Sequence, residues 1–150
     1  MKQLSTIFIS FICILLTGCG GSENSTFQTK QSELSQGVSN WNNSGLTTYQ
    51  YTYRRTCFCP PEEDIIVSVV DGNISEAVYT PSGTQLESSA LNGLYTVNDL
   101  FSEVQKAIND EVASLDTKYD GHFGYPTLIS IDRDRMIVDE EITHEILAFQ

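Results

Sequence analysis

The segment "TVNDLFSEVQKAI", residues 96–108, predicts an amphipathic helix that needs a surface to pack on. Thr96 is suited to be its N-cap, and Asp99 stands three positions later, where a capping box places an acceptor. Apolar residues recur at intervals of three and four, which is helical spacing; they are Val97, Leu100, Phe101, Val104 and Ile108. Because this stripe covers one side only, we expect Phe101 to face a core that the flanking segments supply.

Segments with strand character lie on both sides of this helix. They are residues 48–53, 65–70, 74–80, 115–119, 127–132 and a last stretch from Met136 through Ile142, His144 and Ile146. Turn sequences separate them at residues 71–73, 120–121 and 133–135. A first, shorter helix is expected around Leu34, Val38 and Trp41, and the polar residues 42–45 end it.

The order is therefore a helix followed by three strands, twice. This order predicts the α+β class: a single domain with an antiparallel β-sheet of about five to six strands and two helices packed on one face. The hairpins "VSVVDGNI" and "ISIDRDRM" are alike. A helix-plus-three-strand unit repeated twice by duplication is thus an alternative, although any two hairpins share these features.

The N-terminus predicts export and a lipid anchor. A basic start is followed by the apolar residues 4–16, a run shorter than the roughly 20 residues of a membrane span but typical of a signal peptide. "LTGC", residues 16–19, has the form of a lipobox, whose cysteine is acylated; a cleavable signal with a chance cysteine is the alternative. We expect a signal peptide at 1–18, lipidation of Cys19, a flexible tether at 19–30 and the domain at 31–150. The expected location is the cell envelope, and the outer membrane facing the periplasm if the host is Gram-negative.

The chain is acidic. Its net charge is −12, and removing residues 1–18 with Lys2 would leave 150 − 18 = 132 residues at −13. Such a surface repels phosphate backbones, so nucleic acid is not expected as a partner. The length suffices for one domain with a hydrophobic core.

Cysteine usage isolates one pair. Cys13 would leave with the signal peptide and Cys19 would carry lipid, so Cys57 and Cys59 remain for each other in an oxidising compartment. In an ideal strand their Cα atoms would be about 6.6 Å apart, at the upper limit for a disulfide. The following Pro60 favours the bend that a bridge requires. A structural disulfide is the first interpretation; a redox couple and a metal site are the alternatives.

Other candidate sites are weaker. The sequence contains no G-x-S-x-G, H-E-x-x-H or phosphate-loop motif, so neither catalytic residues nor a cofactor are expected. His122, in a turn, and His144, on a strand, are expected to be structural. Tyr49, Tyr51 and Tyr53 share one strand face, which favours core packing over a ligand platform. A cis Tyr125–Pro126 bond is also considered.

An acidic cluster near the C-terminus raises calcium binding as an alternative. Asp132 and Asp134 imitate the start of a calcium loop, and residues 139–141 add three carboxylates. Ile137 occupies the position where that loop requires glycine, so a solvated hairpin tip is the preferred interpretation and no metal is assigned.

Several of these stretches together resemble a known family. They are Trp41, "YQYTY" (49–53), "CFCP" (57–60), "VDG" (70–72), "TVNDLF" (96–101), "YDGHFGYPTLISID" (119–132) and "DEE" (139–141). In this order they resemble family 6174 of domains of unknown function, which is found in bacterial lipoproteins and other exported proteins. The resemblance implies a fold and export, and it implies no activity.

The first functional hypothesis is a non-enzymatic, membrane-anchored domain that binds another envelope component through its sheet or its acidic rim. A redox or metal-handling protein using Cys57 and Cys59 is one alternative. An inhibitor-like domain directed against a secreted enzyme is another. The expected partners are the membrane, through Cys19, and an envelope protein or ligand.

Overall fold

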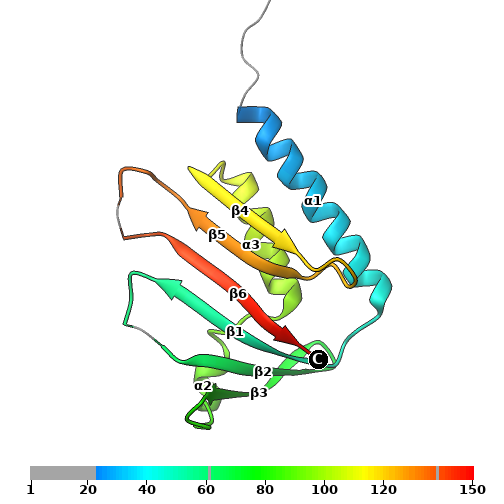
Figure 1. Cartoon of the computed structure of the whole chain (residues 1–150), viewed down its shortest axis with the longest axis vertical. Helices are drawn as coiled ribbons and strands as arrows, with labels where there is room; N and C mark the ends of the chain where they lie inside the picture. Colours follow the sequence, from blue (N-terminus) through cyan, green and yellow to red (C-terminus); the bar gives the residue numbers. More distant parts are fainter. Residues whose placement is uncertain (1–22, 61, 138) are drawn as a thin grey trace, which may run out of the picture.

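A computed structural model describes residues 23–60, 62–137 and 139–150, which form one α+β domain (Figure 1). Its elements are α1 (Glu23–Ser44), β1 (Tyr49–Cys57), β2 (Asp64–Val70), β3 (Asn73–Thr80), α2 (Ser88–Leu91), α3 (Val97–Asn109), β4 (Ser114–Tyr119), β5 (Pro126–Asp132) and β6 (Ile142–Phe149). The strands form one antiparallel sheet in the order β3-β2-β1-β6-β5-β4. The predicted fold class is confirmed.

The first strand occupies the middle of the sheet and carries aromatic residues into the core. Tyr49, Tyr51 and Tyr53 are 6%, 1% and 3% exposed, so they are core residues and not an open ligand platform. Their hydroxyl groups still find partners, as buried polar groups must. Tyr49 accepts a hydrogen bond from the Val97 amide at 3.1 Å, and Tyr51 donates one to the Tyr95 carbonyl.

Helix α3 packs across this face of the sheet, as its apolar stripe predicts. Thr96 caps the helix, and its side chain and that of Asp99 form the reciprocal bonds of a capping box. Phe101 is 6% exposed and stacks on Tyr119 of β4 with ring centres 6.4 Å apart. The expectation that Phe101 faces the core is confirmed.

Helix α1 begins earlier than the sequence suggested. Residues 23–30 were expected in the flexible tether, but the structure places them in the helix. The physical reason is packing: Phe27 lies against the hydrophobic core, and Lys30 lies within hydrogen-bond distance of Thr117 at 3.4 Å. Residues 19–22 lie outside the described residues.

A close contact joins α1 to the turn before β5. A Cβ atom placed on Gly124 would lie 2.6 Å from the Gly37 carbonyl oxygen and 2.7 Å from the Asn40 Cβ. Gly124 also has a φ of 82°, a conformation that other residues rarely adopt. Glycine at this position therefore lets the helix and the turn meet.

The helix-plus-three-strand order occurs twice, but no rotation relates the two blocks. β1 and β4 open the blocks and run in opposite directions, because three antiparallel steps separate them in the sheet. The strand order within each block runs the same way across the sheet, and both helices pack on the same side of β4, where Lys30 and Phe101 contact Thr117 and Tyr119. Only a mirror operation would superpose the blocks, so the repeated order does not reflect repeated structural units.

Two local predictions were wrong. The last strand begins at Ile142 and not at Met136, because Asp134 turns the chain: its Oδ1 accepts from the Met136 amide at 2.9 Å and its carbonyl accepts from the Ile137 amide at 2.9 Å. Among the described residues a cis proline bond joins Thr80 to Pro81, and the Tyr125–Pro126 bond is trans.

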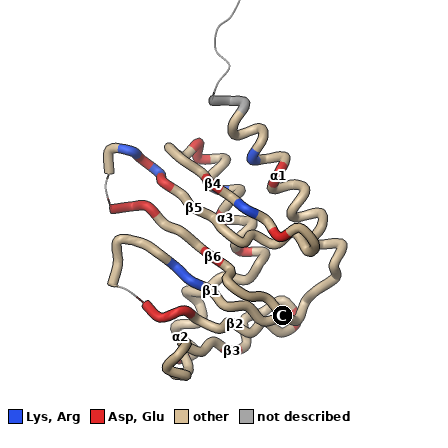
Figure 2. Tube along the Cα trace, viewed as in Figure 1, with Lys and Arg blue, Asp and Glu red and all other residues tan. Residues whose placement is uncertain are grey.

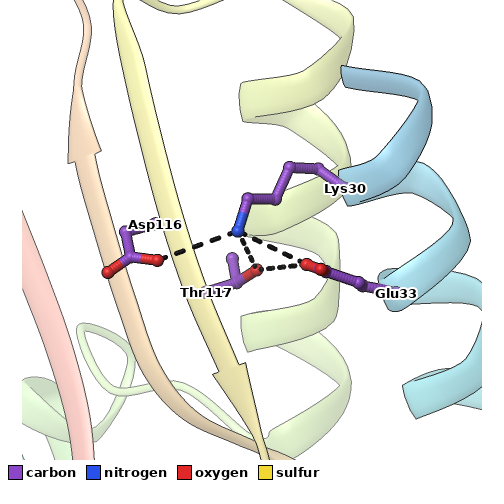
Figure 3. Close-up of polar contacts among 4 residues, drawn as sticks. All are labelled: Lys30, Glu33, Asp116 and Thr117. Atoms are coloured by element: carbon purple, nitrogen blue, oxygen red, sulfur yellow. Dashed lines mark hydrogen bonds and ion pairs between the residues drawn. The ribbon is translucent and has the colours of Figure 1, made fainter. Parts of the chain in front are cut away.

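Each edge strand of the sheet makes contacts with another segment of the chain. At β4, Lys30 of α1 forms an ion pair with Asp116 of the strand at 3.7 Å and a second one with Glu33 of its own helix at 3.3 Å (Figure 3). On β3, the Leu86 amide donates to the Ala77 carbonyl and the Tyr79 amide donates to the Thr84 carbonyl, both at 2.9 Å. Because open edges invite strand addition, the bonds to residues 84–86 disfavour strand addition at this part of β3.

Candidate interaction surface at the disulfide end of the sheet

Two connections project from one end of the sheet. Residues 58–63 join β1 to β2, and residues 133–141 join β5 to β6. They lie at the same end because β1 and β6 are antiparallel neighbours, with Cys57 opposite Ile142 (Figure 1). We call this end of the sheet the disulfide end.

The structure pairs Cys57 with Cys59. Their Cα atoms are 5.2 Å apart, closer than in an extended strand, so the chain bends where β1 ends. Phe58, between the two cysteines, is turned outward and is 79% exposed. The pair therefore fixes the backbone on both sides of an exposed aromatic ring.

Large apolar side chains are exposed at both connections. Phe58 is joined by Met136, 88% exposed, and Ile137, 51% exposed, from the β5–β6 connection. The other large hydrophobic residues of comparable exposure in the described part of the chain, Val70 and Leu147, lie towards the opposite ends of their strands. A local concentration of exposed apolar side chains is typical of an interaction site.

A hollow of about 460 Å³ lies beside Phe58. Its walls are formed by Thr56, Cys57, Phe58, Ser114, Ser130, Ile131, Asp132, Glu141 and Thr143. Ser130 and Thr143 lie opposite each other on β5 and β6, and their hydroxyl oxygens are 3.2 Å apart. These residues alternate with the buried Ile129, Ile131 and His144, so the hollow opens on the sheet face that the helices do not cover.

Charge at this end is mostly negative (Figure 2). Two nearby arginines are in ion pairs: Arg54 pairs with Asp64 at 2.7 Å, and Arg133 pairs with Glu103 and Asp110 at 3.8 and 3.5 Å. Arg135 donates to the Ala113 carbonyl at 3.1 Å and forms no ion pair with the described residues. Five acidic residues form no ion pair with other described residues; they are Asp132, Asp134, Asp139, Glu140 and Glu141. The disulfide end therefore carries a surplus of negative charge.

Neither of the two histidines forms part of this exposed surface. His144 is 2% exposed on the covered face, and its Nδ1 lies 2.6 Å from the Tyr53 hydroxyl. Burial, and then the charge of Arg55, lower the pKa of His144 to about 4, while burial raises the pKa of Tyr53. His122 packs against Phe123 in the turn before β5, with ring centres 4.4 Å apart. Because its pKa of about 4 lies well below 7, His144 is a neutral core residue at pH 7.

No set of three or more His, Cys, Asp or Glu side chains among the described residues is arranged to hold a metal ion, and this includes the acidic residues considered for calcium. Likewise, none of the helices within the described ranges has the length and apolar character of a membrane span. Cys19 lies outside the described residues, so its lipidation stays a prediction.

The sequence identified the cysteine pair but missed the hollow and the exposed tips. Phe58 lies between the two cysteines of the CFCP motif. A bridge between its two neighbours is the sequence signal from which its outward orientation could have been predicted. Met136 and Ile137 were assigned to a strand, and only the Asp134 turn reveals their exposure.

Comparison with known proteins gives a family and no activity. The comparisons with curated proteins and with solved structures returned no match. The model of the family of unknown function DUF6174 matches residues 33–150, which span the second half of α1 and every strand of the sheet. The chain therefore belongs to the DUF6174 family.

Proposed function

We propose that this protein is an exported, lipid-anchored domain without enzymatic activity that binds a partner protein in the cell envelope. The observation that carries the proposal is the exposure of Phe58, Met136 and Ile137 at one end of the sheet. The paired cysteines support it because they hold Phe58 outward, which reduces the entropy lost when the ring is buried by a partner.

The anchor rests on the sequence of the N-terminus. A Cys19→Ser variant should lose acyl labelling and move from the membrane to the soluble fraction, because the acidic domain adds no affinity for anionic lipids. A salt-washed membrane fraction that still holds the variant would contradict the lipid anchor without affecting the proposed binding surface.

Site-specific photo-crosslinking in the native host tests the surface. A photoreactive amino acid is placed at Phe58, at Met136 and, as the matched control, at Val70, which is 47% exposed near the opposite end of β2. We expect the first two positions to capture the same protein and position 70 to miss it. Equal capture from all three positions, or none from 58 and 136, would overturn the proposal. If the captured protein were a secreted enzyme, assaying it with this domain would test the inhibitor alternative.

Thiol–disulfide exchange is the second candidate, and the exposure of Cys59 favours it. A substrate thiolate would attack the Cys59 sulfur and release the Cys57 thiolate; a second substrate thiol would then resolve the mixed disulfide, leaving two protein thiols and an oxidised substrate. Replacing both cysteines by serine separates the two functions. Thiol–disulfide exchange should be lost in this variant, whereas crosslinking of the partner from position 58 should weaken without disappearing.

A further inference from the structure

We propose that the hollow beside Phe58 receives a lysine or arginine side chain of the partner protein. This inference rests on the proposed function and names the chemistry by which the disulfide end selects its partner. Its basis is the combination of a shaped recess, two carboxylates in its wall and an aromatic ring at its rim.

The recess has the composition of a site for a cationic group. Asp132 and Glu141 supply negative charge, while Ser114, Ser130 and Thr143 supply hydroxyl oxygens that accept hydrogen bonds from an ammonium or guanidinium group. Asp132 Oδ1 is shielded from solvent and accepts no hydrogen bond from any described residue. A buried acceptor of this kind is costly until a donor reaches it, so a cationic donor would be favoured there.

Phe58 adds a contact that an inorganic cation would use poorly. Its exposed ring borders the hollow, where the alkyl stem of a lysine or the plane of a guanidinium would pack on it. The described carboxylates do not form a three-ligand set for a metal ion, whereas one ammonium or guanidinium needs only one or two carboxylates.

The surrounding charge favours the same class of partner. Arg54 and Arg133 are already paired, and Arg135 alone does not balance the five unpaired acidic residues at this end, so this end attracts a positively charged surface. An acidic partner would be repelled, and a neutral apolar partner would leave the Asp132 oxygen unsatisfied.

The inference is tested with full-length ¹⁵N-labelled protein in detergent micelles. The probes are Nα-acetyl-lysinamide and Nα-acetyl-argininamide, with Nα-acetyl-norleucinamide as a control that retains the alkyl chain and lacks the charge. We expect both basic probes to shift the amide signals of Ser114, Ser130 and Thr143, and norleucinamide to leave them unchanged. Asp132→Asn should weaken binding of the basic probes about tenfold, which corresponds to about 1.4 kcal/mol.

Glu76→Gln is the matched control variant, because Glu76 is an exposed carboxylate on β3, away from the hollow. It should bind the basic probes as the native protein does. Equal shifts with norleucinamide, no shifts with either basic probe, or an Asp132→Asn variant that binds normally would each overturn the inference. Those results would leave crosslinking from Phe58 unaffected, so failure of the cation site and failure of the proposed function are distinguishable.

Discussion

The two faces of the sheet are formed by the same strands but differ in burial: one packs against the helices, and the other is open. On β1, Tyr49, Tyr51 and Tyr53 point to the helices and are buried, whereas Gln50, Thr52 and Arg54 alternate with them on the open face. The open-face residues satisfy one another: Gln50 donates to Ser68 at 2.9 Å, and Arg54 binds Asp64 through two nitrogens at 2.7 and 2.9 Å.

This difference shows where a partner is expected to bind. A polar face whose side chains already pair with each other gains little from being covered. The apolar exposure lies instead at the disulfide end, so the interaction is expected through the tips of two connections and the hollow beside them. Of the two surfaces that the sequence suggested, the sheet and the acidic rim, this end corresponds to the rim.

The largest expected effect is on the covered face. Phe101→Ala should lower the free energy of unfolding by about 3–5 kcal/mol, through lost burial and the cavity left against Tyr119. Leu147→Ala, at a residue of β6 that is 44% exposed, should cost less than about 1 kcal/mol. Denaturant unfolding of both variants measures the contrast, and equal losses would erase the distinction between buried and exposed positions.

The junction between α1 and the turn before β5 comes next. Gly124→Ala should cost about 2–4 kcal/mol, because the methyl group meets the Gly37 carbonyl and the left-handed backbone disfavours any side chain. Gly121→Ala in the same turn is the control, since a Cβ atom there meets open space. If both variants were as stable as the native protein, the helix would not be held this closely.

Acid should weaken the covered face through His144. Its pKa of about 4 in the folded state lies below the ordinary 6.5, so the unfolded chain binds the proton more readily. The stability contributed by neutral His144 is therefore complete above about pH 6.5 and is lost as the pH falls toward 4, by about 2–3 kcal/mol between pH 7 and pH 4.5.

A His144→Gln variant isolates this contribution. Denaturant unfolding at the two pH values should show a smaller pH dependence for the variant than for the native protein. An identical pH dependence in the two proteins would mean that other groups, and not His144, govern the acid response.

The smallest effect is expected at the disulfide end. Reducing the bond between Cys57 and Cys59 should lower stability by less than about 2 kcal/mol, because a loop of so few residues removes little entropy from the unfolded chain. Intact mass spectrometry with thiol alkylation should find no free thiols before reduction and two after it. Two alkylatable thiols in freshly exported protein would refute the bridge, and reduction without any loss of stability would refute its structural role.

Local patterns in the sequence determined much of the fold. A helix or strand that is buried on one side shows a regular spacing of apolar residues within one segment of the chain. The apolar stripe around Phe101, which follows the cap at Thr96, and the alternating tyrosines of β1 are patterns of this kind. The bridge between Cys57 and Cys59 was accessible for the same reason, since both partners lie within one short motif.

Contacts between distant segments were decided only by the tertiary structure. The start of α1 depends on Phe27 and Lys30 meeting the core and β4, and Gly37 shows its role only beside Gly124. The hollow unites residues from β1, β4, β5 and β6, and the opposite directions of β1 and β4 follow from the strand order. Such features arise from register and packing across the sheet, where many pairings satisfy the same local pattern and the energy of the whole domain selects one.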